Sequence, residues 1–231
     1  FARELQLLLQ YLGVSEANME KGEMRVEANV SVRTKAQQDK NEFGTKVEVK
    51  NLNSFRAVLR AIQFEVKRHI QLLESGGTVI QETRGYDEGT DSTFSQRLKE
   101  SSHDYRYFPE PDLPKLLLQE VEEFSPALLQ KSLPELPDVK RLRYSEWGVK
   151  VEDIEMLVRD STLEAYFKEI AGMIAAAEVR KIAVNYIISD IAGLRKNVGD
   201  PIFDLITPTH VVDIATLLHE GEVSSRAAKN I

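Results

Sequence analysis

The sequence predicts an α+β fold: an antiparallel sheet with a covering helix, followed by an all-α part and the start of a further small helical part. Three observations support this prediction. Two stretches alternate between apolar and polar residues, a long amphipathic stretch with capping residues follows them, and strand patterns stop after Pro114 while helix patterns continue. We therefore expect three parts with boundaries near residues 115 and 206, namely 1–115, 116–206 and 207–231.

Residues 24–33 (MRVEANVSVR) and 45–50 (TKVEVK) predict the first two strands as an antiparallel pair. In each stretch, every second residue is apolar, as in Met24, Val26, Ala28, Val30 and Val32, or Val47 and Val49. Because side chains alternate across a strand, this pattern gives one buried face and one polar face. Residues 78–84 and 92–98 predict two more short strands, joined by the turn-rich segment GYDEGTD.

Residues 53–77 (NSFRAVLRAIQFEVKRHIQLLESGG) predict the helix that covers the apolar side of the sheet. Asn53 or Ser54 is a suitable N-cap, and Gly76 and Gly77 end the helix. Its apolar stripe at helical spacing consists of Phe55, Val58, Leu59, Ile62, Val66, Ile70 and Leu73. Arg56, Arg60, Gln63 and Lys67 form a separate basic face.

The remainder of the chain predicts successive helices over 116–131, 138–147, 151–159, 161–174 and 177–197. A further helix begins with Thr207 as cap and Pro208 in its first turn, continues to His219 and is ended by Gly221. Ser224 or Ser225 then starts another helix.

Composition limits the function classes. With 42% hydrophobic and 29% charged residues, the 231-residue chain has the composition of a globular protein, and its length favours more than one domain. The absence of cysteine excludes disulfides and thiolate metal sites and agrees with a reducing cytoplasm. The net charge of −7 argues against a general nucleic-acid coat, and no apolar run is long enough to cross a membrane.

Common catalytic motifs are absent. The sequence contains no GxxxxGK[ST] or GxGxxG phosphate loop, no GxSxG nucleophile motif, and no ligand spacing among His69, His103, His210 and His219. Any nucleotide chemistry must therefore use a less common fold. The chain opens on Phe1 and closes on an uncapped helix pattern, so we expect a fragment of a longer polypeptide.

The polar face of the predicted strand pair has two interpretations. Its residues are Glu27, Asn29, Ser31 and Arg33 on the first strand, and Glu48 and Lys50 on the second. A solvated sheet face is the ordinary interpretation. Alternatively, the carboxylates and polar oxygens hold Mg²⁺ while the cations meet phosphate. The continuation KNLNSFR favours the second interpretation a little, because it places amide donors beside a helix N-terminus.

The segment SSHDYRYFPEPDLP (101–114) is also open to two interpretations. Pro109, Pro111 and Pro114 are typical of a stiff connector. A connector does not require the preceding run of His, Asp, Tyr, Arg and Tyr, which suits a charged ligand equally well.

Several ordered stretches resemble the B subunit of tRNA-dependent amidotransferases. They are MEKGEMRVEANVSVR, GTKVEVKNLNSFRAVLRAI, QETR, RLKESSHDYRYFPEPDLP, LPELPDVKRLRY and ITPTHVVDIATLLHEGEVSSRAAKNI. The resemblance implies a cradle domain up to residue 115 that uses ATP and Mg²⁺, a helical domain, and the start of a tRNA-binding tail domain. It further implies a cytoplasmic enzyme with an amidase subunit and a small third subunit as partners, and tRNA(Gln) or tRNA(Asn) as the nucleic acid that it acts on.

The resemblance also implies roles for individual residues. It gives catalytic roles to Glu27, Asn29, Arg33, Glu48, Lys50, Asn53, Arg97, Lys99, Asp104 and Arg106. Substrate or nucleotide binding falls to Ser31, Asn51, Arg56, Arg84, Glu100, His103 and Tyr105. Within this set, Glu27 and Glu48 are expected near Mg²⁺, and Lys50, Arg97 or Arg106 near phosphate.

The chain departs from the family pattern at three points. Glu27 stands where the family has Asp, Phe94 stands where the family usually has Arg, and the N-terminal half of the cradle is missing. We therefore expect the chain alone not to catalyse amidation. A non-catalytic tRNA-binding and assembly module is the alternative.

Overall fold

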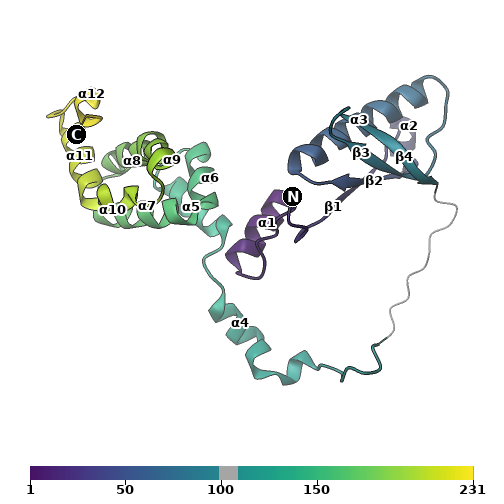
Figure 1. Ribbon diagram of the computed structural model, residues 1–231, viewed down its shortest axis with the longest axis horizontal. Coiled ribbons are helices and arrows are strands. Elements are labelled where there is room, and N and C mark those ends of the chain that lie inside the picture. Colours follow the sequence, from purple (N-terminus) through teal and green to yellow (C-terminus); the bar gives the residue numbers. More distant parts are fainter. Residues whose placement is uncertain (99–108, 231) are drawn as a thin grey trace. The chain divides into compact units, whose positions relative to one another are not determined.

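The computed structural model describes residues 1–98 and 109–230, without the side chains of Arg97 and Leu98. The chain divides into two compact units, Phe1–Leu133 and Pro134–Ile231 (Figure 1). The three-part division predicted at residues 115 and 206 stays a prediction. Among the described residues, no helix combines the length and apolar character needed to cross a membrane.

A four-stranded sheet forms the centre of the first unit, in the order β1-β2-β3-β4. The strands are β1 (Val26–Val30), β2 (Val47–Leu52), β3 (Glu82–Asp87) and β4 (Ser92–Leu98). The predicted antiparallel pairing of β1 with β2 is confirmed, and β3 and β4 are also antiparallel. The pairing of β2 with β3 is parallel, so the sheet is mixed and not antiparallel throughout.

The long helix α3 (Phe55–Glu74) explains this parallel pair, because it returns the chain to the end of the sheet from which β2 started. The strand predicted at 78–84 was placed too early, since Gly85–Asp87 belong to β3 and the turn contracts to the residues just before β4. The strand predicted at 92–98 is confirmed.

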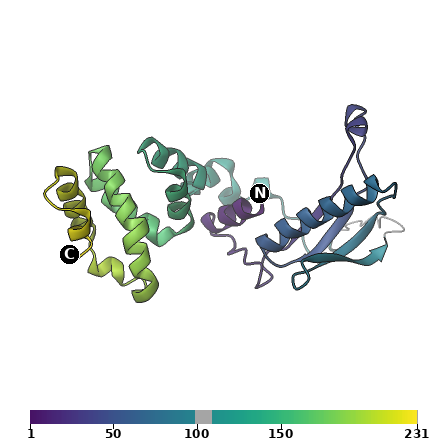
Figure 2. The ribbon, with the colours of Figure 1, turned by 90° about the horizontal axis from the view of Figure 1, so that it is seen from above.

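The helix α3 lies across one face of the sheet (Figure 2). Its N-cap is Ser54, whose hydroxyl accepts a hydrogen bond from the Ala57 N–H at 3.0 Å. The shared core consists of Ala28, Val30, Val49, Leu52, Ala57, Ala61 and Tyr86, with Val58, Ile62 and Val66 packed against it.

The predicted apolar stripe of α3 was only partly right. Leu59 is 57% exposed, while the most buried positions run through Ala57, Ala61, Glu65 and His69. The two alanines allow the helix to approach the sheet closely, and Glu65 contacts Arg84 of β3 and the Thr93 hydroxyl of β4. The helix is therefore turned relative to the stripe that hydrophobicity alone predicts.

The other elements of the first unit are short. They are α1 (Ala2–Tyr11), α2 (Lys35–Asp39), the 3₁₀ turns η1 (Leu118–Glu120) and η2 (Glu122–Phe124), and α4 (Pro126–Ser132). The single helix predicted at 116–131 was wrong in its first half. Ser125 is extended, with ψ of 137°, because the residue before a proline disfavours the helical region.

The second unit is all-α, as predicted. Its helices are α5 (Pro137–Glu146), α6 (Val151–Arg159), α7 (Ser161–Met173), α8 (Ala177–Tyr186), the π-helical η3 (Ile187–Ile191), α9 (Ala192–Val198), α10 (Ile202–Leu205), α11 (Pro208–Glu220) and α12 (Ser225–Ala228). Tyr144, Leu157, Phe167, Ile170 and Ile187 are its most buried large side chains.

The predicted ends of α11 are confirmed. Thr207 forms a capping box with His210, Pro208 occupies the first turn, and Gly221 closes the helix in the left-handed conformation with φ of 78°. A glycine suits this position because it adopts positive φ without steric cost.

Candidate functional site

One face of the sheet carries charged and polar side chains and lies opposite α3. Since Ala28 and Val49 face α3, their neighbours Glu27 and Asn29 in β1, and Glu48 and Lys50 in β2, point to the other face. We call this the open face of the sheet. The strand register aligns Asn29, Glu48, Thr83 and Arg97 in one row across the four strands.

Three charged residues meet on the open face. The Lys50 ammonium lies 3.4 Å from Glu27 Oε1 and 4.0 Å from Glu48 Oε2. The Thr83 hydroxyl donates a hydrogen bond to Glu48 Oε2 at 3.0 Å, which fixes that carboxylate. The side chains of Glu27 and Lys50 remain 44% and 43% exposed. Ion pairs at such exposure contribute little stability, so Lys50 can turn toward an anion at small cost.

A pocket of about 550 Å³ adjoins this cluster at the end of β2. Four of the residues expected at the site line it: Glu27, Lys50, Asn51 and Asn53. Asn51 has φ of 62°, and its side-chain amide donates to the Tyr86 carbonyl at 3.2 Å. This positive φ lies where the register between β1 and β2 shifts, between the pairs Ala28–Val49 and Val26–Leu52.

The same pocket contains residues that the sequence did not single out. Its lining also includes residues 19–22, 24 and 25, among them the cations Lys21 and Arg25. This segment folds through the Asn18 side chain, whose Oδ1 accepts hydrogen bonds from the backbone N–H groups of Glu20 and Lys21. The motif EKGEMR directly before β1 was the available signal for these lining residues.

Arg84 lies on the other face of the sheet, beneath α3. Its guanidinium donates to Glu82 Oε1 at 2.6 Å and to the Thr93 hydroxyl at 2.8 Å, and lies 3.2 Å from Glu65 Oε1. With 13% of its side chain exposed, Arg84 is part of a buried ion network and does not join the cluster around Lys50.

This network beneath α3 is charge-balanced. Arg68 donates to both carboxylate oxygens of Glu65, and the His69 ring nitrogen Nε2 lies 3.1 Å from the same carboxylate. Burial alone would raise the pKa of Glu65, but hydrogen bonds from Arg68 and Thr93 bring that pKa below its ordinary value. Burial lowers the pKa of His69. These groups are therefore paired with one another, and the expected binding role of Arg84 stays a prediction.

The remaining predicted residues are dispersed. Ser31 and Arg33 follow the end of β1, where the Arg33 guanidinium stacks over the Phe43 ring at 5.3 Å. Arg56 is exposed in the first turn of α3. Six further predicted residues lie outside the described part of the chain: Lys99, Glu100, His103, Asp104, Tyr105 and Arg106.

The open face suits Mg²⁺ in its donor chemistry. Glu27 and Glu48 provide carboxylate oxygens within reach of one cation, the Lys50 ammonium. In the described part of the chain, no group of three or more His, Cys, Asp or Glu residues is arranged to hold a metal. Two carboxylates nevertheless fit Mg²⁺, which usually binds one or two protein carboxylates together with substrate phosphates.

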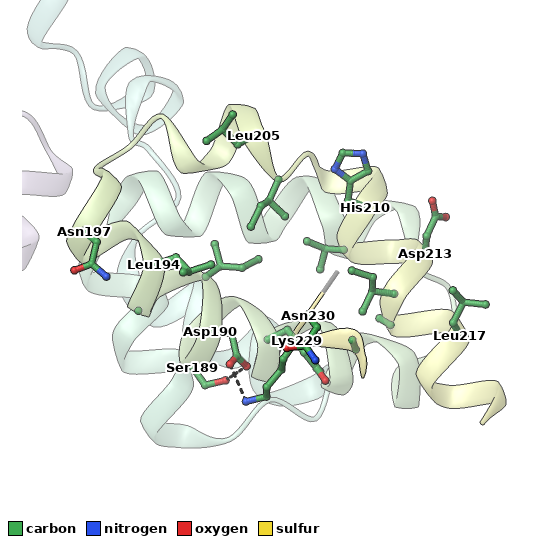
Figure 3. Close-up of a pocket in the computed structure, with 18 residues that line it drawn as sticks. Ser189, Asp190, Leu194, Asn197, Leu205, His210, Asp213, Leu217, Lys229 and Asn230 are labelled. Carbon is green, nitrogen blue, oxygen red and sulfur yellow. Dashed lines mark hydrogen bonds and ion pairs between the residues drawn. The ribbon is translucent and has the colours of Figure 1, made fainter. Parts of the chain in front are cut away.

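A larger pocket, of about 900 Å³, lies within the second unit (Figure 3). Its walls come from η3, α9, α10, α11 and the end of the chain, and are mainly aliphatic, as at Leu194 and Leu205. At one side, Asp190 pairs with Lys229 at 2.7 Å. None of the predicted site residues lies there. The smaller pocket combines convergent charges with the predicted residues, so we take it and the open face as the candidate site.

Known proteins resemble the whole chain. Residues 1–122 match the GatB/GatE catalytic domain. The B subunit of a chloroplastic/mitochondrial glutamyl-tRNA(Gln) amidotransferase from Physcomitrium patens is 43% identical over the full chain. The B subunits of the aspartyl/glutamyl-tRNA(Asn/Gln) amidotransferases from Picosynechococcus sp. and Persephonella marina are 43% and 40% identical, again over the full chain.

The chain spans less than half the length of these relatives, covering 40%, 45% and 48% of them respectively. The matched domain nevertheless includes more than half of this chain, with the whole sheet, α3 and the charged open face. The chain therefore belongs to the GatB/GatE catalytic-domain family.

Proposed function

We propose that this chain is part of the B subunit of a tRNA-dependent amidotransferase. The enzyme would convert Glu-tRNA(Gln), Asp-tRNA(Asn) or both to the correctly amidated Gln-tRNA(Gln) and Asn-tRNA(Asn). Family membership and the names of the relatives support the proposal. The observation that carries it is the convergence of Glu27, Glu48 and Lys50 on the open face, beside a polar pocket.

The chemistry requires activation of a carboxylate. A carboxylate reacts poorly with ammonia, because it offers no adequate leaving group. Transfer of a phosphoryl group from ATP to the tRNA-bound carboxylate provides that leaving group, and ammonia then displaces phosphate. Such a transfer depends on positioning and on neutralising phosphate charge.

In this chain, Lys50 would contact the phosphates, since its half-exposed ammonium forms ion pairs that cost little to break. Glu27 and Glu48 would hold Mg²⁺, which when bound neutralises phosphate charge. Thr83 keeps the Glu48 carboxylate oriented. Asn51 and Asn53 would bind substrate in the adjoining pocket. Arg97 and Arg106 remain proposed as further phosphate ligands.

The proposal includes partners. An amidase subunit with its own nucleophile would release ammonia from glutamine, and a small third subunit would complete the assembly. The tRNA would bind mainly through residues 116–206 and 207–231, the predicted helical and tail domains. A cytoplasmic location belongs to the same proposal.

The Glu27→Ala variant of the assembled amidotransferase tests the proposed site. We expect at least a roughly tenfold loss of ATP-dependent amidation, because one carboxylate of the Mg²⁺ pair is removed, while hydrolysis of glutamine by the amidase subunit continues. The matched control is Glu88→Ala, which removes an exposed carboxylate from the turn between β3 and β4.

Full amidation by Glu27→Ala would contradict the site assignment. Equal losses in both variants would also contradict it, since they would indicate a general charge effect. If the assembly binds tRNA through this chain but amidation never depends on the cluster around Lys50, the chain acts as a binding and assembly module.

A further inference from the structure

An aromatic ring lies on the otherwise polar open face of the sheet. In β4, Thr93 points to α3, where its hydroxyl bonds to Glu65, so its neighbour Phe94 points to the open face. Phe94 is 48% exposed. About half of the residue is therefore accessible to a ligand.

The support for this ring is a glycine. A Cβ atom at Gly85 would lie 2.7 Å from Phe94 Cζ and 2.6 Å from Gln96 Nε2. Both β4 side chains therefore lie directly over Gly85, which is opposite Phe94 in the strand register. Any larger residue at this position would displace them. Phe94 and Gln96 thus form one continuous surface, an aromatic ring beside an amide.

This surface adjoins the charged cluster. Gly85 is also opposite Lys50 in the parallel pair of β2 and β3, so Lys50, Gly85 and Phe94 form one row across three strands. Neighbouring strands are about 4.8 Å apart. An aromatic platform thus lies within one nucleotide length of the ammonium proposed to bind phosphate.

A purely structural role for Phe94 explains its contact with Gly85 but not its exposure. Aromatic residues stabilise sheets by covering a glycine on the next strand, and Phe94 makes that contact. That role does not require that Phe94 be 48% exposed, nor that the Gln96 amide lie over the same glycine.

We infer that Phe94 and Gln96 form a platform for the purine base of the nucleotide whose phosphates bind at Lys50. The inference rests on the proposed function and extends it to the base. An aromatic ring stacks on the π-face of a base, and a Gln amide offers both a donor and an acceptor, which matches the N6 and N7 edge of adenine.

Equilibrium binding to the assembled amidotransferase tests this inference, with Mg²⁺ and either ATP or inorganic tripolyphosphate as the ligand. Phe94→Leu keeps an apolar cover on Gly85 but removes the π-face. It should weaken ATP binding about tenfold, because base–aromatic stacking contributes on that scale, and leave tripolyphosphate binding unchanged. Phe94→Tyr, which retains the ring, should bind ATP within about twofold of the unaltered enzyme.

Control measurements distinguish a folding defect, a wrong assignment of the platform and a wrong proposed function. Equal thermal stability of the Leu and Tyr variants shows that a change in binding is not a folding defect. If both ligands bind and Phe94→Leu weakens neither, the platform is overturned while the proposed phosphate site stands. If tripolyphosphate and ATP both fail to bind the unaltered enzyme, the proposed function itself is overturned.

A third ligand tests whether the platform binds the base of free ATP or a base of an RNA chain. A short RNA ending in adenosine offers the same purine as ATP. Loss of RNA binding without loss of ATP binding in Phe94→Leu would overturn the assignment of the platform to the free nucleotide.

Discussion

Two adjacent residues of β3 point to opposite faces of the sheet, because side chains alternate along a strand. Thr83 faces the open side and orients Glu48, while Arg84 faces α3 and pairs with Glu65 and Glu82. Both belong to the motif QETR, which sequence resemblance treats as one unit. A one-residue difference therefore decides whether a side chain lies on the open face or beneath α3.

Replacing Arg84 by Met should lower the free energy of unfolding of the first unit by about 3 kcal/mol. The reason is that Glu65 and Glu82 would lose a buried partner, and an uncompensated buried charge is costly. Urea unfolding followed by circular dichroism measures the change. Trp147, the only tryptophan in the sequence, provides an internal reference, because its fluorescence reports on the second unit.

Arg56→Met is the matched control. Arg56 is exposed in the first turn of α3, so its replacement should change the free energy of unfolding by less than about 0.5 kcal/mol. If Arg84→Met leaves stability unchanged but abolishes nucleotide binding, Arg84 acts at the site and its burial is not a structural requirement.

At the scale of elements, α3 shows what the sequence predicts well and what it does not. Periodicity and capping residues located the helix and both of its ends, because these signals are local. They did not predict that Glu65 and His69 would be among its most buried positions. Their partners are Arg84 and Thr93, far away in sequence, so the orientation of α3 depends on tertiary contacts that no local pattern contains.

The buried network makes the stability of this element depend on pH. His69 faces Glu65 and Arg68 from its own helix and Arg84 from β3, and burial holds its pKa below the ordinary value of 6.5. The folded state therefore binds fewer protons than the unfolded state below pH 6.5. Stability from this group is present above pH 6.5 and is lost as the pH falls through that value toward the folded pKa.

We expect the free energy of unfolding of the first unit to fall between about pH 7 and pH 5, and His69→Gln to reduce that fall. Denaturation midpoints across this range measure it. The carboxylates Glu65 and Glu82, whose pKa values lie below the ordinary 4.5, add a separate loss only below that pH. His219→Gln, at an exposed position of α11, should retain the full dependence. An unchanged slope in His69→Gln would show that another group titrates.

At the scale of the whole molecule, the sequence predicted the fold class and the residues of the charged cluster, but not their geometry. The alternation in 24–33 and 45–50 identified Glu27, Glu48 and Lys50 because it is a local property. The parallel pairing of β2 with β3 places Gly85 opposite Lys50, and that depends on the crossover through α3. The roles expected for Lys99 to Arg106 stay predictions, since those residues lie outside the described chain.

The second unit should fold when residues 134–231 are produced alone. It has a core of its own, in which Tyr144, Phe167 and Ile170 are fully buried, and Tyr144 donates a hydrogen bond to Glu164, which also pairs with Lys140 at 3.0 Å. Because a compact unit with its own core unfolds cooperatively, Trp147 fluorescence should show one sharp urea transition, close to that of the complete chain.

Phe167→Ala should lower the stability of the isolated unit by about 3–5 kcal/mol, since it leaves a cavity at a position with 0% exposure. Leu205→Ala, at 65% exposure, should change it by less than about 0.5 kcal/mol. A broad, non-cooperative transition in the isolated unit would show that residues 134–231 require the rest of the chain. Similar losses in the two variants would show that Phe167 is not part of a fixed core.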